Sequence, residues 1–418
     1  MKIVIVGCGV IGVTTAYCLK RRGHEVTVID RESGPGRETS FANGGLLTPS
    51  MPDPWNAPGS WRVLLGSLGR SDAALQLRLR TLPALVGWGI QFLRHSRPAV
   101  FERSRVHNLR LALYSLNAMD ALRQQTDIEY GRSALGTLRV FRNQAAWDRT
   151  AMAAGGLGCE GLGFRKLTVP QMVDLEPALA PIAHQLTGAI HYEMDEAGDA
   201  HQFCRALADQ AQRLGVEFRF HTEVRALQAH AGRVQALLTD GASFVADRYI
   251  VAAGSYSTPL LRRVGVHVPV CPAKGYSVTF EGLQYRQTLS IPVIDDDLHA
   301  AVIPLGGAIR VAGTAEFAGY DRTLNPDRAR NLVALLQRIL PQATFDLDAG
   351  KPWCGLRPMS VDGVPVIGAT PLSNLAVNTG HGPLGWTSAA GSAQLLTDLI
   401  SGDPPSIDPA PFALTRFL

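Results

Sequence analysis

Three glycines near the start of the chain have the spacing of a nucleotide-binding turn. Gly7, Gly9 and Gly12 follow a short apolar run, and Asp30 closes the next apolar run, 26–29. In a strand–turn–helix unit the first glycine allows the tight turn, the second lets the backbone approach a pyrophosphate, and the third permits close helix–strand packing. A carboxylate at the position of Asp30 accepts hydrogen bonds from a ribose 2′-hydroxyl and repels a 2′-phosphate. The pattern therefore predicts a dinucleotide site that disfavours NADP.

This chemistry needs a strand over 3–6, a helix over 11–20 and a second strand over 26–29. The lysine and apolar stretch at the start also look superficially like a secretory leader. The glycine spacing and the acid in its place favour the nucleotide-binding unit instead.

The glycine- and proline-rich passage after Asp30 is the second candidate for cofactor contact. Long loops inside compact domains are usually functional or disordered. Its small side chains and exposed backbone, at Thr39, Ser40, Asn43, Gly44 and Gly45, would suit a flat ring. A plain surface loop explains the same residues equally well.

Two later segments repeat this pattern. Residues 201–215 predict a helix and 216–224 a strand, and Val224 would lie where a loop could contact the adenine side of the cofactor. The strand over 249–252 runs into Ala253 and Gly254, whose small size lets a backbone segment approach the cofactor closely. Tight turns that need no ligand are the alternative.

The last block of the chain joins a glycine-rich loop to a helix predicted over 386–401, which forms another anion-stabilising terminus. Both ends of the chain thus contribute to one cofactor domain, which is discontinuous. We expect an α/β fold with a cofactor domain and a second domain built on a mostly antiparallel sheet. The expected cofactor domain comprises 1–56, 195–258 and 350–418, and the expected substrate domain comprises 57–194 and 259–349. Within the latter, the predicted elements are strands at 137–141, 276–280, 301–305 and 309–317, and a helix at 326–340.

Composition excludes several classes of protein. The 418 residues carry a formal net charge of +4 without a run of lysines or arginines, so a nucleic-acid partner is not expected. No apolar stretch reaches the about 18 residues that span a bilayer. Six cysteines without C-x-x-C spacing argue for a reducing, cytoplasmic location and against a disulfide framework or a metal site.

Residues 61–115 look helical, with a further long helix over 101–125. Between 61 and 97, arginines alternate with tryptophans and leucines. This mixture is typical of an amphipathic segment in a membrane interface. Packing of the same helix on its own domain is the alternative, and the pattern slightly favours it.

Several motifs together resemble the FAD-dependent D-amino acid oxidase superfamily, and within it the bacterial D-amino acid dehydrogenases. They are TSFANGG, VAAGSYS, KGYSV, GLRPMSVDGVPVIG and NTGHGPLGW, and the resemblance runs nearly end to end. It implies non-covalent FAD in a Rossmann-type domain, an antiparallel substrate sheet, and hydride transfer from a D-amino acid to flavin N5, giving an imino or keto acid. It also implies electron delivery to a quinone or another acceptor and peripheral attachment to the inner face of the cytoplasmic membrane.

The chain departs from the commonest dehydrogenase pattern at two positions. Leu46 stands where many members have glutamine, and Pro383 replaces a threonine. Similar loops occur in relatives that oxidise D-proline or hydroxy-D-proline, so a cyclic D-amino acid is one candidate substrate.

The resemblance assigns roles to individual residues. Arg357 would bind the substrate carboxylate through two parallel charge-assisted bonds, with an interdomain salt bridge as the alternative. Tyr276 would donate its phenol to the same carboxylate or simply cap the sheet. His381 would touch substrate or ring, or serve as a plain hydrogen-bonding residue, and it is not assigned as a base. Amides of 382–386 would stabilise negative charge on the reduced flavin.

The complete set of expected FAD-binding residues combines the motifs above with their neighbours: Gly7, Gly9, Val10, Ile11, Gly12, Asp30, Arg31, Thr39, Ser40, Asn43, Gly44, Gly45, Leu46, Val224, Ala253, Gly254, Gly355, Gly382, Leu384, Gly385, Trp386 and Thr387. No metal ligands are expected. Two alternative functions remain open: an oxidase of glycine- or sarcosine-type amines that produces peroxide, and a flavin-binding subunit of a membrane complex.

Overall fold

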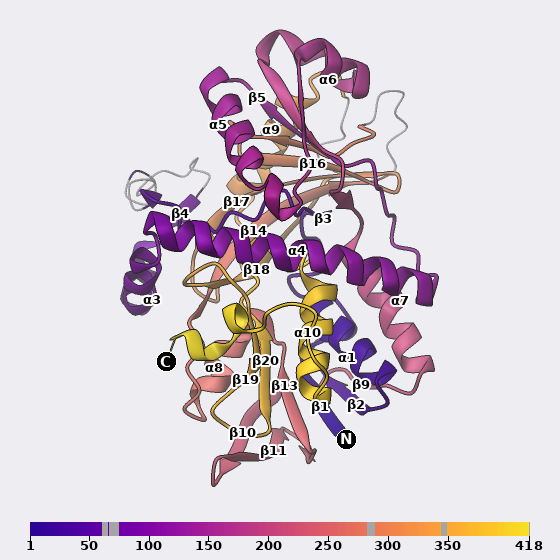
Figure 1. Cartoon of the computed structure of the whole chain (residues 1–418), viewed down its shortest axis with the longest axis vertical. Helices are drawn as coiled ribbons and strands as arrows, with labels where there is room; N and C mark the ends of the chain where they lie inside the picture. The colour runs from indigo at the N-terminus through magenta and orange to yellow at the C-terminus, as the bar shows by residue number, and fades with distance from the viewer. Residues whose placement is uncertain (61–65, 67–74, 282–288, 344–348, 418) are drawn as a thin grey trace.

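The computed structural model describes residues 1–60, 66, 75–281, 289–343 and 349–417. Two sheets dominate it, one in the lower and one in the upper half of Figure 1, and the long helix α4 (Pro98–Thr126) crosses between them. Segments from both ends of the chain meet in the lower half, which is therefore assembled from distant stretches of sequence.

The lower sheet is built around the nucleotide-binding unit predicted from the sequence. Its strand order is β19-β20-β13-β1-β2-β9, with parallel pairing except between β19 and β20. The strands are β1 (Lys2–Val6), β2 (Glu25–Ile29), β9 (Glu217–Arg219), β13 (Arg248–Val251), β19 (Val366–Ala369) and β20 (Leu375–Thr379).

Alternation along β1 explains how this sheet is covered on both faces. Ile3 and Ile5 share a buried cluster with three helices, whereas Val4 and Val6 face the small sheet β10-β11-β12. Successive strand side chains point to opposite faces, so a fully apolar strand needs cover on both. The helices are α1 (Val10–Arg21), α7 (Ala200–Arg213) and α10 (Ala389–Ser401), and the small sheet comprises β10 (Val224–His230), β11 (Arg233–Thr239) and β12 (Ser243–Phe244).

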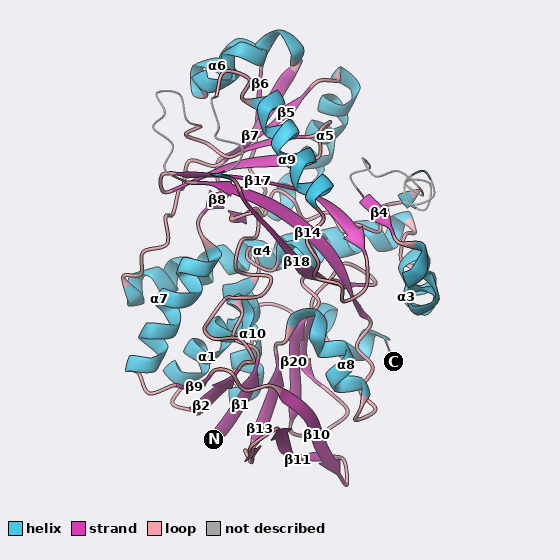
Figure 2. Cartoon of the chain, turned by 180° about the vertical axis from the view of Figure 1, so that it is seen from behind, coloured by secondary structure: helices cyan, strands magenta, loops and turns pink. Residues whose placement is uncertain are grey.

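The upper sheet has the mostly antiparallel character that the sequence predicts. Its order is β18-β14-β17-β16-β15-β5-β7-β6, with β4 added beside β17. The strands are β4 (Leu75–Leu77), β5 (Thr137–Phe141), β6 (Arg165–Leu167), β7 (Gly188–Tyr192), β14 (Val270–Phe280), β15 (Val293–Asp295), β16 (Ala300–Leu305), β17 (Ala308–Phe317) and β18 (Lys351–Ser360). Helix α9 (Pro326–Ile339) lies over one face, and the other face turns toward the lower half (Figure 2).

The remaining elements frame these sheets. Helix α4 packs on α10 so closely that a Cβ at Gly391 would lie 2.9 Å from the Cα of Ser115. The short strands β3 (Leu46–Leu47) and β8 (Glu196–Ala197) pair with each other. Peripheral helices are α3 (Leu82–Arg94), α5 (Gln144–Gly156), α6 (Val169–Leu175) and α8 (Ser257–Arg262). Among the described residues, no helix is both long enough and apolar enough to cross a membrane.

Three predicted elements differ from the structure for identifiable reasons. The helical prediction for 61–115 is confirmed in α3 and in the first part of α4, but it is wrong at β4 and at Arg97, where the chain is extended before Pro98. The strand predicted over 216–224 is divided at His221, whose φ is +52°. The last helix begins at Ala389 rather than at 386, after a single 3-10 turn over 382–384.

The division into two domains stays a prediction, and two elements cross its boundaries. Strand β18 was assigned with the cofactor domain but pairs with β14 in the upper sheet. Leu111, Met119 and Leu122 of α4, assigned with the substrate domain, belong to the core of the lower half.

Candidate active site

Glycine suits each of the three positions in the opening motif for a different physical reason. Gly7 has a φ of +105°, and a Cβ there would lie 2.6 Å from the carbonyl oxygen of Ala252. A Cβ at Gly12 would collide with the carbonyl oxygen of Gly7, so this glycine permits the close packing of helix on strand. A Cβ at Gly9 would meet only the Ser40 hydroxyl, at 3.4 Å. Nothing in the protein demands glycine at position 9, so its bare backbone fits the predicted approach of a pyrophosphate to the start of α1.

Asp30 lies at the end of β2, as the motif requires. Its carboxylate accepts hydrogen bonds from the amides of Cys8 (2.6 Å) and Glu32 (2.8 Å). Burial raises the pKa of Asp30, while the two amide bonds oppose that rise. Next to it, Arg31 pairs with Glu38 and lies over the ring of Tyr256, 3.9 Å from the centroid.

One large cavity of about 1590 Å³ joins these groups to the upper sheet. It is lined by Arg357, Tyr276, His381 and 20 of the 22 residues expected to bind FAD. Gly12 and Thr387 are the two that do not line it: Gly12 serves helix packing, and the Thr387 hydroxyl accepts a hydrogen bond from the amide of Thr48 at 3.0 Å. The cavity thus brings together segments that are up to 379 residues apart, from Gly7 to Trp386.

The loop after Asp30 is tied to both halves of the molecule. The Ser40 hydroxyl accepts from the amide of Val10 at 3.0 Å, at the start of α1. The Thr39 hydroxyl donates to the carbonyl of Leu356 at 2.9 Å, and the carbonyl of Asn43 accepts from Arg310 at 3.0 Å. These bonds make the loop a fixed wall of the cavity, which favours the cofactor interpretation over a surface loop.

His381 is held as a neutral hydrogen-bonding residue. Its Nε2 lies 3.0 Å from the hydroxyl of Ser392 on α10, and burial lowers the pKa of His381 to about 3. The imidazole therefore carries no charge at neutral pH, which agrees with leaving it unassigned as a base.

Arg357 is a cation at the cavity without a protein counter-ion. Its Nη1 donates to the carbonyl of Thr314 at 3.3 Å, and its guanidinium lies 5.6 Å from the ring centroid of Trp55. Within the described part of the chain, no carboxylate lies within ion-pairing distance of it. Burial lowers the pKa of Arg357 to about 10, so the group remains charged near neutrality. The predicted alternative, an interdomain salt bridge, is not found among these residues.

Gly275 makes room for this guanidinium. A Cβ at Gly275 on β14 would collide with the terminal nitrogens and carbon of the Arg357 side chain. Glycine inside a strand often marks the close approach of another group. The Arg357 side chain therefore lies flat across β14, on the face that turns toward the cavity.

The Tyr276 hydroxyl is engaged by the protein, which favours the second of its two predicted roles, capping of the sheet. Since neighbouring side chains alternate, its ring lies on the opposite face of β14 from Gly275, in a cluster with Val278 and α9. Its hydroxyl donates to Glu316 Oε2 at 2.7 Å. The phenol proton is thus engaged by a buried carboxylate on the far side of the sheet.

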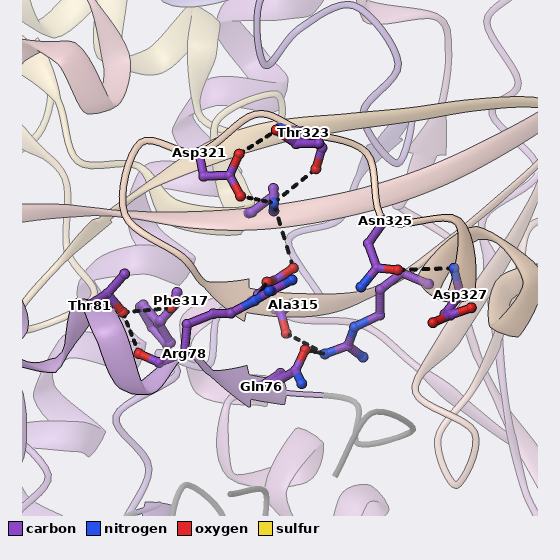
Figure 3. Close-up of polar contacts among 12 residues, drawn as sticks. Gln76, Arg78, Thr81, Ala315, Phe317, Asp321, Thr323, Asn325 and Asp327 are labelled. Atoms are coloured by element: carbon purple, nitrogen blue, oxygen red, sulfur yellow. Dashed lines mark hydrogen bonds and ion pairs between the residues drawn. The ribbon is translucent and has the colours of Figure 1, made fainter. Parts of the chain in front are cut away.

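Lys274 belongs to the same buried charge cluster. Its ammonium lies 3.7 Å from Glu316 and 3.3 Å from Asp321, and donates to the carbonyl of Thr323 at 3.1 Å. Figure 3 shows Asp321 and Thr323 together at one side of this cluster, with Arg78 and Gln76 approaching from the β4 segment. Arg78 pairs with Glu316 as well. Lys274 is therefore fully buried and paired.

Sequence reasoning missed Gly275, Thr314 and Trp55. The glycine inside the strand-like run KGYSV was the signal that a second group crosses the strand. Thr314 and Trp55 gave no signal, because their positions beside Arg357 depend on strand pairing. Within the described ranges, no group of three His, Cys, Asp or Glu side chains could hold a metal ion.

Comparisons with known proteins agree with this geometry. The sequence profile of the FAD dependent oxidoreductase family, DAO, matches residues 2–399. A D-amino acid dehydrogenase of Paramagnetospirillum magneticum is 42% identical over 418 residues, covering 100% of this chain and 99% of the relative. A D-amino acid dehydrogenase of Allorhizobium ampelinum is 41% identical over 417 residues, with 100% and 99% coverage.

Solved structures share the fold. Glycine oxidase from Geobacillus kaustophilus superposes with a TM-score of 0.76 at 23% identity, covering 100% of this chain and 98% of that one. L-Proline dehydrogenase from P. horikoshii gives a TM-score of 0.78 at 18% identity, with 100% and 97% coverage.

The residues present fit FAD. The glycine turn at the start of α1, the acid at the end of β2 and the two remote backbone walls line one continuous cavity. The predictions of an α/β fold, an FAD cofactor and an oxidoreductase are therefore confirmed. This chain belongs to the family of FAD-dependent oxidoreductases.

Proposed function

We propose that the chain oxidises a D-amino acid to the imino acid, which water converts to the keto acid, and that Arg357 anchors the substrate carboxylate. The observation that carries this proposal is the cation itself. Arg357 is half-buried at the cavity, and among the described residues its guanidinium donates only to a carbonyl, at 3.3 Å, and meets no carboxylate. A substrate carboxylate would complete the pairing through two parallel bonds.

FAD would be held by the walls of the cavity already described. Amides at the start of α1 would face the pyrophosphate, Asp30 the ribose, and the 39–46 loop with residues 382–386 the ring. When bound, FAD supplies the oxidant by accepting a hydride at flavin N5. The chain's own contribution at this step is orientation, because His381 is neutral and the Tyr276 proton is engaged by Glu316.

The choice of D-amino acids rests on the relatives at 41–42% identity, both named D-amino acid dehydrogenase. A cyclic substrate such as D-proline or hydroxy-D-proline is proposed from Leu46 and Pro383, which both line the cavity. Trp55 and Leu75 add apolar surface to the same lining.

We further propose that electrons pass to a quinone at a cytoplasmic membrane surface on which helix α3 rests. One face of α3 packs inward, where Trp88 donates to the carbonyl of Pro269 and stacks near Phe92. The opposite face leaves Val86 56%, Ile90 49% and Leu93 44% exposed. Exposed arginines flank this face: Arg80, Arg94 and Arg97. Residues 61–65 and 67–74, which carry the first part of the predicted segment, lie outside the described residues.

An apolar stripe with flanking cations suits an anionic lipid surface. Wild-type protein and the variant Ile90→Asp/Leu93→Asp should be sedimented with vesicles of phosphatidylglycerol and phosphatidylcholine. We expect the variant to remain in the supernatant. Equal partitioning of the two proteins would contradict attachment through α3.

The proposed reaction is tested by anaerobic titration of the FAD-loaded protein. Bleaching of the flavin by D-alanine or D-proline, and not by the L-enantiomers, is expected. Bleaching by no D-amino acid would refute the proposal. An oxygen electrode beside a dye-reduction assay separates a dehydrogenase from a peroxide-producing oxidase, because only the oxidase consumes oxygen at a comparable rate.

A further inference from the structure

Thr314 has a backbone conformation that its side chain disfavours. Its φ is +51°, in the left-handed region, although it lies within strand β17. A β-branched residue there is a true outlier, because its Cβ crowds the backbone. Such conformations cluster at ligand-binding and catalytic sites, so the outlier prompts a search for a ligand.

The strained residue is the extra residue of a β-bulge. In the pairing of β14 with β17, Gly275 faces Ala315 and Tyr276 faces Gly313, so Thr314 has no partner on β14. Its carbonyl is thereby free of this ladder and accepts the hydrogen bond from Arg357 Nη1. The bulge therefore orients the guanidinium that lies across Gly275.

The side chain of Thr314 has a second unusual property. Its hydroxyl is buried and has no hydrogen-bond partner among the described residues. Thr314 also lines the cavity, together with Arg357. An unpaired buried hydroxyl is unfavourable, and a rotation of about 120° around the Cα–Cβ bond would turn it to another staggered position.

We propose that the hydroxyl of Thr314 donates a third hydrogen bond to the carboxylate held by Arg357. This inference rests on the proposed function, since it deepens the carboxylate site. A carboxylate has about four lone-pair positions, so a bidentate guanidinium leaves room for a further donor. Thr314 would then act twice, through its carbonyl on Arg357 and through its hydroxyl on the ligand.

The test distinguishes the effect of the Thr314 hydroxyl on binding from the effect of the backbone conformation. Thr314→Val keeps the shape and removes the hydroxyl, and Thr314→Ser keeps the hydroxyl. Ala231→Gly is the matched control: Ala231 also has a positive φ, +48°, but lies in the turn between β10 and β11. Calorimetry measures the binding of propionate to each FAD-loaded protein. The kcat and KM for a D-amino acid and the thermal midpoint of unfolding are measured for the same proteins.

We expect Thr314→Val to weaken propionate binding and to raise KM by roughly tenfold or more, because the hydrogen bond is to a charged group. Thr314→Ser should bind propionate within about threefold of the wild type. Ala231→Gly should raise the thermal midpoint and leave binding unchanged. Equal propionate affinity in the wild type and Thr314→Val would overturn the inference.

The two proposals fail in different ways. If no D-amino acid reduces the flavin of the wild type, the proposed reaction is wrong, yet propionate binding still decides the role of Thr314. If the wild type is reduced and Thr314→Val behaves like it, only the role of Thr314 is wrong.

Discussion

Two cations lie on adjacent strands of the upper sheet and face opposite sides of it. Lys274 on β14 is fully buried and has Glu316, Asp321 and the carbonyl of Thr323 within 3.7 Å. Arg357 on β18 is half-buried, with one carbonyl at 3.3 Å and the ring of Trp55. Among the described residues, carboxylates compensate the charge of Lys274 and not that of Arg357.

The difference separates a structural charge from a binding charge. A buried ion pair with satisfied hydrogen bonds holds strands together, and its loss leaves an uncompensated charge. A half-buried cation at a cavity, without a carboxylate partner among the described residues, would keep its strongest bonding capacity for a ligand. We therefore propose that the far face of the sheet serves stability and the cavity face serves recognition.

The largest effect is expected on the compensated side. Lys274→Met would leave the buried Glu316 with one cation fewer and should cost about 3–5 kcal/mol in the free energy of unfolding, seen as a lower thermal midpoint. Arg357→Met is the control, since it removes a charge that has no protein carboxylate. Equal destabilisation by the two substitutions would contradict the distinction.

The complementary effect is expected in binding. Arg357→Met should weaken the affinity for a carboxylate substrate by about 2–5 kcal/mol, because the carboxylate of the substrate would lose its positively charged partner. Substrate titration of the FAD-loaded protein measures it, and the variant should keep its thermal midpoint. An unchanged KM would show that the carboxylate binds elsewhere.

A substitution with a smaller expected effect tests the space that Gly275 leaves for the guanidinium of Arg357. Gly275→Ala should displace the end of the Arg357 side chain without unfolding the protein, because that end is flexible. We expect KM to rise about tenfold, corresponding to about 1.4 kcal/mol. Gly241→Ala, where a Cβ would meet nothing within 4 Å, is the matched control. Equal KM values for the two variants would show that Gly275 does not determine the position of the guanidinium.

The last prediction concerns pH dependence and two buried carboxylates. Glu316, beside cations and the Tyr276 hydroxyl, has a lowered pKa, whereas burial raises the pKa of Asp195 to about 7. Among the described residues, the Asp195 carboxylate accepts hydrogen bonds from Ser50 and Thr137. A raised carboxyl pKa means that the folded state binds the proton more tightly. The corresponding stability is complete below the ordinary value of 3.8 and is lost as pH rises toward 7.

Asp195→Asn should therefore reduce the decline in thermal midpoint between pH 4 and pH 7. The measurement is a series of thermal melts across this range for the wild type and the variant. Parallel curves would show that Asp195 does not titrate in the folded protein.

The sequence predicts the lower half of the molecule well because its signals are local. The first strand, helix and second strand, and the roles of Gly7 and Gly12, follow from short-range geometry. Long-range pairing was less accessible: β18 was assigned with the cofactor domain but joins β14 across about 80 residues. The short strand β4 was hidden within an apparently helical stretch, since its pairing partner β17 is remote in sequence.

The parts of the site that lie within recognisable sequence motifs could be predicted. Arg357 and most of the cavity lining lie in the motifs that carry the resemblance. Two roles stayed open for Tyr276 because the sequence does not state which face of β14 its ring occupies. Thr314 was missed because the bulge that strains it is created by the register of two strands.

The most direct test of the central claim is a crystal structure of the FAD-loaded protein with propionate. Two parallel hydrogen bonds between the carboxylate and the guanidinium of Arg357, on the cavity face of β14, are expected. A carboxylate bound elsewhere in the cavity, or Arg357 paired with an acidic side chain of the protein, would contradict the account.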